Sequence, residues 1–247
     1  MGTDVKYKRI LLKLSGEALQ NKEKDENGNV IEKEELFDFV FIDKIAAVIK
    51  KCVSEGVQIG IIVGAGNIWR GREGTDMDRV RADHMGMLAT SINALALQDA
   101  FIRNGIDTVV MTSVEMKAFA EPFTIRGAIS ALEDGKVVIF GGGLGEPYFS
   151  TDTAAALRAA EINADAILMA KNVDGIYNAD PNKVKNAKRY DDIAYSDVIS
   201  KGLKAIDLTA AAFCLENDIL CFAFGLMDPE NIYRVITGEA IGTTLHK

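Results

Sequence analysis

The sequence is poor in the residues that most hydrolytic and metal-dependent sites require. It contains 2 histidines, and His246 is the residue before last, so only His84 is placed to take part in chemistry. This scarcity excludes a histidine-rich zinc site and argues against a Ser-His-Asp triad. The 3 cysteines, Cys52, Cys214 and Cys221, show no CxxC spacing, and we expect them to be reduced core residues.

Two common nucleotide-binding signatures are also missing. No GxxxxGK[ST] run occurs, and no complete GxGxxG follows a predicted strand. The chain is therefore expected to be neither a P-loop kinase nor an ordinary dinucleotide-binding protein.

The chain also lacks a basic surface and long apolar runs. Its formal net charge is -8, which argues against a nucleic-acid partner or an anionic membrane surface. No apolar run approaches the roughly 20 residues that span a bilayer, and the N-terminus has no apolar signal-peptide core. With 247 residues, 48% of them hydrophobic, we expect one compact cytoplasmic domain spanning 1–247.

What the sequence does contain is a regular alternation of strand-like and helix-like segments. We expect strands at 8–14, 57–63, 107–112, 136–140, 165–170 and 219–224, and helices at about 33–54, 78–104, 124–134, 152–163, 206–217 and 229–237. This alternation predicts an α/β fold with helices on both faces of a central, mainly parallel sheet. Segment 20–35 is charged and expected to be a mobile loop, and 171–195 is long enough to be a functional loop.

Three predicted strands run into glycine-bearing loops. The stretch 137–161 passes from a strand through four glycines to Ser150-Thr151-Asp152-Thr153 and an alanine-rich helix, while strands 8–14 and 58–63 end at Ser15-Gly16 and Gly64-Ala65-Gly66. Backbone N–H groups at glycine loops and helix N-termini bind phosphate, although glycines here are also compatible with tight turns alone. Together the three loops predict an anion site at the carboxyl edge of the sheet.

Two cations are candidates for contact with that anion. Lys13 lies in an otherwise apolar strand, and an unpaired buried ammonium is costly, so we expect it to face an anion or to form a structural ion pair. Arg70 follows the Gly64-Ala65-Gly66 loop and offers a bidentate fork suited to phosphate, or it is a solvated surface arginine. Trp69 is interpreted as a packing residue.

Two carboxylates each have two interpretations. Asp83, in a predicted helix, is placed to accept hydrogen bonds from a sugar hydroxyl or to pair with Arg79 four residues back. Asp207 precedes an alanine-rich helix, so it is either an N-cap or an organiser of Lys13 and other cations.

Six segments together resemble the bacterial UMP kinases (uridylate kinases) of the amino-acid kinase superfamily. They cover nearly the whole chain in the right order: KRILLKLSGEAL at 8–19, GAGNIWRG at 64–71, ADHMGMLATSINALALQDA at 82–100, GEPYFSTDTAAALRAAEI at 145–162, VDGIYNADP at 173–181 and LKAIDLTAAAF at 203–213. The resemblance implies an amino-acid-kinase-like three-layer sandwich, with an acceptor-binding lobe at about 1–163 and an ATP-binding lobe at about 164–247. It implies transfer of a phosphoryl group from MgATP to UMP, giving UDP and ADP in pyrimidine nucleotide biosynthesis.

The resemblance also implies a role for individual residues. Catalytic roles fall on Lys13, Arg70 and Asp207, and contacts to the ATP phosphates on Lys13, Leu14, Ser15, Gly16, Gly66 and Arg70. UMP contacts fall on Ala65, Asp83, Leu144, Gly145, Glu146, Pro147, Tyr148, Phe149, Ser150 and Thr151. At the adenosine end Tyr177 and Asp180 match, while a third contact falls on Lys171 by spacing and on Asn172 by chemistry.

The implied acceptor is a phosphate that is already anionic, so the reaction needs no general base. Mg²⁺ would be held mainly by the ATP phosphates, with no dedicated metal site on the protein. The resemblance further implies a homohexamer with UTP as inhibitor and GTP as activator. The acidic segment 20–35 stands where the activator loop is expected and predicts a weak, absent or relocated GTP response. The competing hypotheses are a kinase for a carboxylate acceptor and a nucleotide-binding sensor without turnover.

Overall fold

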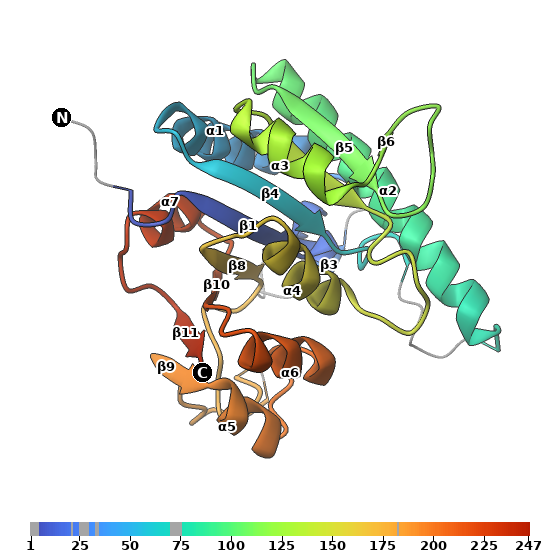
Figure 1. Ribbon diagram of the computed structural model, residues 1–247. Helices are drawn as coiled ribbons and strands as arrows, with labels where there is room; N and C mark the ends of the chain where they lie inside the picture. Colours follow the sequence, from blue (N-terminus) through green and yellow to red (C-terminus); the bar gives the residue numbers. More distant parts are fainter. Residues whose placement is uncertain (1–4, 21, 25–29, 33–34, 70–75, 182) are drawn as a thin grey trace.

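One nine-stranded sheet runs through the molecule (Figure 1). The computed structural model describes the chain except residues 1–4, 21, 25–29, 33–34, 70–75 and 182. All neighbouring strands in the sheet are parallel except β10 and β11, so the predicted mainly parallel sheet is confirmed. The order is β6 (Glu121–Pro122), β5 (Thr108–Thr112), β7 (Val137–Gly141), β4 (Gln58–Val63), β1 (Arg9–Leu14), β8 (Ala166–Lys171), β10 (Cys221–Gly225), β11 (Thr243–His246) and β9 (Asp192–Ala194).

Helices cover both faces of this sheet. One face carries α1 (Phe39–Ser54), α2 (Arg79–Arg103) and α7 (Glu230–Ile236), and the other carries α3 (Ile125–Glu133), α4 (Thr151–Glu161), α5 (Tyr195–Ser200) and α6 (Leu208–Glu216). Strand β1 shows why two cores form. Its Ile10 and Leu12 pack into the first core and Leu11 into the second, because successive strand side chains point to opposite faces. The architecture is the predicted three-layer sandwich.

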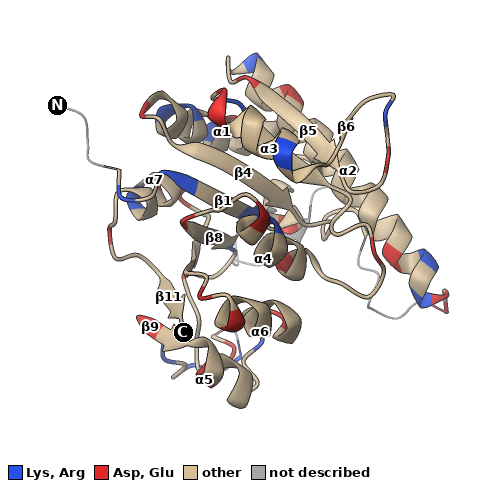
Figure 2. Cartoon of the chain, in the orientation of Figure 1, with Lys and Arg blue, Asp and Glu red and all other residues tan. Residues whose placement is uncertain are grey.

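Helix α2 bears on the expectation that no apolar run spans a bilayer. By length and composition it is apolar enough to cross a membrane, and no other helix of the described chain is. Half of its apolar stretch is buried, and the helix packs against β5 and β7. Its charged residues gather at the ends, as Figure 2 shows clearly at the end that begins with Arg79. These contacts make α2 a core helix.

The three cysteines lie in the core as free thiols, as predicted. Burial raises the pKa of Cys52 to about 12 and that of Cys214 to about 11. Burial also raises the pKa of the Cys221 thiol. All three are therefore neutral packing residues at physiological pH.

The structure differs from the sequence expectations mainly in short elements. The segment 20–35, expected to be a mobile loop, contains the antiparallel pair β2 (Lys22–Lys24) and β3 (Val30–Glu32). The helix expected from residue 33 begins at Phe39, where Asp38 accepts a hydrogen bond from the Phe41 backbone N–H. Strands β9 and β11 were not predicted. They are too short to show an apolar run, and their pairing depends on distant neighbours.

Candidate functional site

The carboxyl ends of the central parallel strands meet at one edge of the sheet. Strand β1 lies between β4 and β8, and its Lys13 is in register with Ile62 and Met169. Strand β7 pairs with β4 and leads into the third glycine loop at Gly142. Ligands of open parallel sheets bind at this edge. The structure thus brings together the three loops that the sequence predicted.

The first two loops lie in direct contact. A Cβ atom on Gly16 would come within 2.4 Å of the Gly64 carbonyl oxygen, so only glycine fits here. Asn93 of α2 donates a hydrogen bond of 2.7 Å to the same carbonyl. Leu14 is buried, and Ser15 precedes the short 3-10 helix Gly16–Leu19. The contact of Gly16 with Gly64 and the hydrogen bond from Asn93 to Gly64 therefore fix the backbone of the predicted phosphate loop.

Lys13 is paired with a carboxylate that the sequence analysis did not select. Its Nζ lies 2.9 Å from Oδ1 of Asp152, and the two side chains are only 12% and 17% exposed. Burial by itself would raise the pKa of the Asp152 carboxyl, but Lys13 and Lys171 outweigh it and hold that pKa below its usual value. Burial and the neighbouring Lys13 lower the pKa of Lys171, although Asp152 opposes them. Lys13 is thus ion-paired with Asp152, whereas Lys171 interacts with that carboxylate electrostatically and donates to the Ala205 carbonyl. Two lysines near one carboxylate favour a further anion beside them.

Asp207 acts as an N-cap and as an acceptor for hydroxyl groups. Its carboxylate accepts a hydrogen bond of 2.9 Å from the Ala210 backbone N–H at the start of α6. It also accepts from the Ser150 hydroxyl and, at 3.0 Å, from the Thr153 hydroxyl. Its backbone hydrogen bond to Asp152 helps to lower the pKa of that carboxyl. The N-cap interpretation is confirmed, and the role of Asp207 as an organiser of Lys13 stays a prediction that its backbone hydrogen bond to Asp152 supports.

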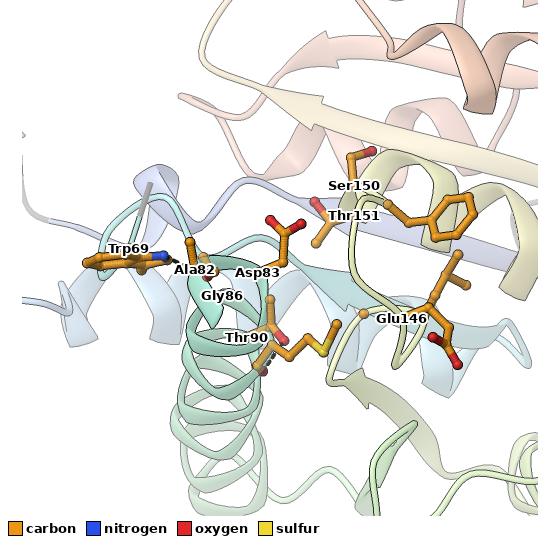
Figure 3. Close-up of a pocket in the computed structure, with 13 residues that line it drawn as sticks. Trp69, Ala82, Asp83, Gly86, Thr90, Glu146, Ser150 and Thr151 are labelled. Carbon is orange, nitrogen blue, oxygen red and sulfur yellow. Dashed lines mark hydrogen bonds between the residues drawn. The ribbon is translucent and has the colours of Figure 1, made fainter. Parts of the chain in front are cut away.

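An open cavity of about 180 Å³ lies between the N-terminal part of α2 and the loop that leads into α4 (Figure 3). Asp83 stands on α2 and faces Ser150 and Thr151 across this space. The predicted pairing with Arg79 is confirmed at 2.7 Å, and Asp83 also lines the cavity, so its contact with a sugar hydroxyl stays a prediction. The lining residues are Ala65, Trp69, Ala82, Asp83, Gly86, Met87, Thr90, Gly143, Leu144, Glu146, Phe149, Ser150 and Thr151.

Most of the residues predicted to contact the acceptor lie at this cavity. Gly145, Pro147 and Tyr148 belong to the same loop but do not line the cavity. Ala65 does line it, and its φ is not positive, so its methyl group is tolerated. Trp69 is more than a packing residue, since it forms one wall with its indole N–H donating to the Ala82 carbonyl at 2.9 Å.

A second cavity, of about 440 Å³, lies between the β8–β9 connection and the segment that precedes α6. Lys171, Tyr177 and Asp180 line it, as the adenosine assignment requires. Asn172 does not, and its side-chain amide donates to Glu17 at 3.2 Å instead. The geometry therefore favours Lys171 over Asn172 at this cavity.

The remaining phosphate candidates lie on the loop after β4. Gly66 faces Glu17, since a Cβ atom on this glycine would meet the Glu17 side chain at 2.9 Å. Arg70 lies outside the described residues. Its predicted place at the phosphates stays a prediction.

Comparison with known proteins identifies the family to which this chain belongs. Residues 8–224 match the sequence model of the Amino acid kinase family. The chain belongs to the amino acid kinase family. It is similar to a UMP kinase from Bacillus anthracis (TM-score 0.87, 37% identity, over 97% of this chain and 96% of that one) and to a UMP kinase from Ureaplasma parvum (0.87, 36%, 97% and 99%). A uridylate kinase from Archaeoglobus fulgidus is more distant (0.71, 28%, 96% and 99%).

Sequence reasoning missed several members of this amino acid kinase site. Asp152 was visible as the first residue of a predicted helix directly after Ser150-Thr151, where a carboxylate favours the helix N-terminus. Thr90 gave no signal, because a threonine inside a long helix is unremarkable. In the structure it is buried, and its hydroxyl accepts a hydrogen bond of 3.0 Å from the Gly142 backbone N–H.

Replacing Asp207 by alanine is expected to lower the free energy of unfolding by about 2–3 kcal/mol, because it removes a helix cap and leaves two hydroxyls without their acceptor. Thr124→Ala is the matched control. Thr124 caps α3 with a single hydrogen bond, from the Gly127 N–H at 3.0 Å, so its loss should cost about 1 kcal/mol. Urea unfolding of both variants measures the difference, and equal losses would contradict the bridging role of Asp207.

Proposed function

We propose that this chain transfers a phosphoryl group from MgATP to UMP, giving UDP and ADP in pyrimidine nucleotide biosynthesis. The observation that carries the proposal is that residues next to the Lys13–Asp152 pair, in the chain or in the sheet, line two different cavities. Ser150 and Thr151 line one cavity and Lys171 lines the other. The similarity to two UMP kinases over 97% of the chain supports the choice of UMP as acceptor.

UMP is assigned to the cavity beside Asp83. Ser150 is the N-cap of α4 and Thr151 its first residue, and both line the cavity. The Ser150 hydroxyl already accepts from the Asp152 and Thr153 backbone N–H groups, so the positive end of the helix dipole is what would favour the acceptor phosphate here. Asp83 offers a carboxylate for the ribose hydroxyls. The adenosine part of ATP is assigned to the second cavity, with Tyr177 and Asp180 on its wall.

The chemistry required of the protein is alignment and charge neutralisation. The acceptor phosphate is anionic at neutral pH, so no residue has to remove a proton from it. Lys13 and Lys171 would stabilise charge on the transferred group, and Arg70 is predicted to add a third cation. Asp152 would keep the two lysine ammonium groups beside each other despite their mutual repulsion.

Mg²⁺ is proposed as the cofactor. In the described part of the chain no three His, Cys, Asp or Glu side chains are grouped to hold a metal, and Asp152 is already ion-paired with Lys13. These residues therefore suit a Mg²⁺ ion that is held by the ATP phosphates and keeps several of its water ligands. When bound, the ion would neutralise charge on those phosphates.

The assay that tests the function is a coupled measurement of ADP release with ATP, Mg²⁺ and a panel of acceptors. We expect UMP to be the best substrate. A faster reaction with aspartate, glutamate or acetylglutamate would support the carboxylate-kinase hypothesis. ATP binding without turnover on any acceptor would support the sensor hypothesis.

We further propose a cytoplasmic homohexamer. Exposed apolar side chains form a stripe along α2, at Met85, Leu88 and Ile92. This spacing of three and four residues places them on one face of the helix, and such an exposed face suits a subunit contact.

We expect Lys13→Ala to lower kcat by about a hundredfold or more while UMP binding stays close to normal, because the ammonium is needed most in the transition state. Lys8→Ala, at an exposed position just before β1, is the control and should leave the kinetics unchanged. Steady-state kinetics and a UMP titration give the two quantities. Near-normal kcat in a folded Lys13→Ala protein would contradict the role of Lys13.

Asp83→Asn is expected to weaken UMP binding more than ATP binding, because Asp83 lines only the first cavity and an amide cannot replace a carboxylate that accepts several hydrogen bonds. Trp69 is the single tryptophan and lines the same cavity, so its fluorescence reports UMP directly. Equal weakening of UMP and an unreactive ATP analogue would instead indicate a purely structural role.

GTP is expected to activate weakly or not at all, whereas UTP inhibition, which needs only the UMP site, should persist. Segment 20–35 is acidic and would repel a triphosphate. Residues 21, 25–29 and 33–34 of this segment lie outside the described residues. Initial rates at subsaturating ATP, with and without GTP, test the expectation. Strong activation that disappears when residues 22–29 are deleted would contradict it.

A further inference from the structure

Tyr148 has a backbone conformation that its side chain disfavours. Its φ is 70°, in the left-handed region that bulky residues rarely adopt. The other described non-glycine residues with positive φ, Asn163 and Asp218, follow the ends of α4 and α6, where such residues commonly terminate helices. Tyr148 terminates no helix and lies in the loop that forms one wall of the first cavity. A strained residue beside a site persists only where its surroundings hold it.

Contacts from α2 hold this residue in place. The Tyr148 backbone N–H donates to Oδ2 of Asp83 at 2.8 Å. Arg79 forms its ion pair with the same oxygen at 2.7 Å, and its guanidinium lies 5.1 Å from the centre of the Tyr148 ring. Arg79, Asp83 and Tyr148 therefore each contact the other two.

These contacts connect opposite walls of the cavity. Arg79 and Asp83 belong to the first two turns of α2, and Tyr148 belongs to the loop that carries Glu146, Phe149 and Ser150 into the lining. We propose that Arg79 and Tyr148 are positioning residues that, with Asp83, fasten this loop to α2 and so set the shape of the acceptor cavity. The three residues are called the clasp below. The proposal deepens the proposed function, on which its link to UMP rests.

The clasp also fixes how Asp83 meets a ligand. Oδ2 already accepts from the Tyr148 backbone and from Arg79. The second carboxylate oxygen has no such contact among the described residues, so it can accept a hydrogen bond from a nucleotide hydroxyl. Arg79 thereby orients the carboxylate, and the hydrogen bond from the Tyr148 backbone N–H to the same oxygen fixes the position of the loop.

The other end of α2 supplies a matched control. Arg103 pairs with Asp99 four residues earlier at 2.8 Å, and its guanidinium lies 5.9 Å from the centre of the Phe39 ring. Helix, spacing and interaction types match those of Arg79, and Arg103 has one further ion pair, with Asp43 of α1 at 3.5 Å. Neither Arg103, Asp99 nor Phe39 lines a described cavity.

The experiment compares Arg79→Gln with Arg103→Gln in the full-length protein. For Arg79→Gln we expect KM for UMP to rise about fivefold, the combined effect of one exposed ion pair and one cation–π contact, with kcat and KM for ATP little changed. Arg103→Gln should leave all three values unchanged. Tyr148→Ala should behave like Arg79→Gln, and Tyr148→Phe, which keeps the ring, should recover most of the UMP affinity that Tyr148→Ala loses.

Amide hydrogen exchange gives a second readout that does not depend on activity. Protection of the Tyr148 N–H should fall in Arg79→Gln and Tyr148→Ala and stay unchanged in Arg103→Gln. Equal effects of Arg79→Gln and Arg103→Gln on KM for UMP and on exchange would overturn the clasp. So would a rise in KM for ATP as large as that for UMP.

The same data separate this proposal from the proposed function. If the unaltered protein does not phosphorylate UMP, the function is wrong, and the exchange comparison still decides whether the clasp holds the loop. If UMP is phosphorylated and Tyr148→Ala has unaltered KM and exchange, the function stands and the clasp is wrong.

Discussion

The buried ion pair between Lys13 and Asp152 is the interaction on which the rest of the site depends. It joins the end of β1 to the first turn of α4, two elements separated by more than half of the chain. Removing one partner of a buried pair typically costs about 3–5 kcal/mol, whereas replacing both by apolar groups is often neutral. The pair is therefore poorly explained as a device for stability. It is well explained as a way to keep an ammonium in the sheet edge, ready for a second anion.

Several features of the fold serve this arrangement. The parallel order of β4, β1 and β8 places Lys13 and Lys171 on adjacent strands, with Gly16 and Gly64 in contact beside them. Asp207, the N-cap of α6, stabilises the same part of the site, because it accepts a hydrogen bond from the Ser150 hydroxyl at the start of α4. The clasp at Tyr148 then fixes the loop just before that helix. Each cavity is thus bounded by elements that the pair and its neighbours hold together.

The sequence predicted the long elements and the residues whose chemistry conflicts with their surroundings. Lys13 stood out because an ammonium in an apolar strand needs a partner, and the glycine loops stood out because they follow strands. Asp152 was missed because a carboxylate near a helix start is common, and only the folded chain shows that it meets Lys13. The choice between Lys171 and Asn172 stayed open because the direction of a side chain depends on neighbours such as Glu17, which is distant in the sequence. Strands β9 and β11 depend likewise on tertiary pairing rather than on local pattern.

We propose that donor and acceptor nucleotides meet at the Lys13–Asp152 pair, one from each cavity. A crystal structure with UMP and an unreactive ATP analogue tests it most directly, through the distances from Lys13 Nζ to the two nucleotides. We predict UMP beside Asp83, adenosine beside Tyr177, and the terminal phosphate of the analogue within hydrogen-bond distance of Lys13. A structure with both nucleotides bound elsewhere, or with Lys13 contacting neither, would contradict the account.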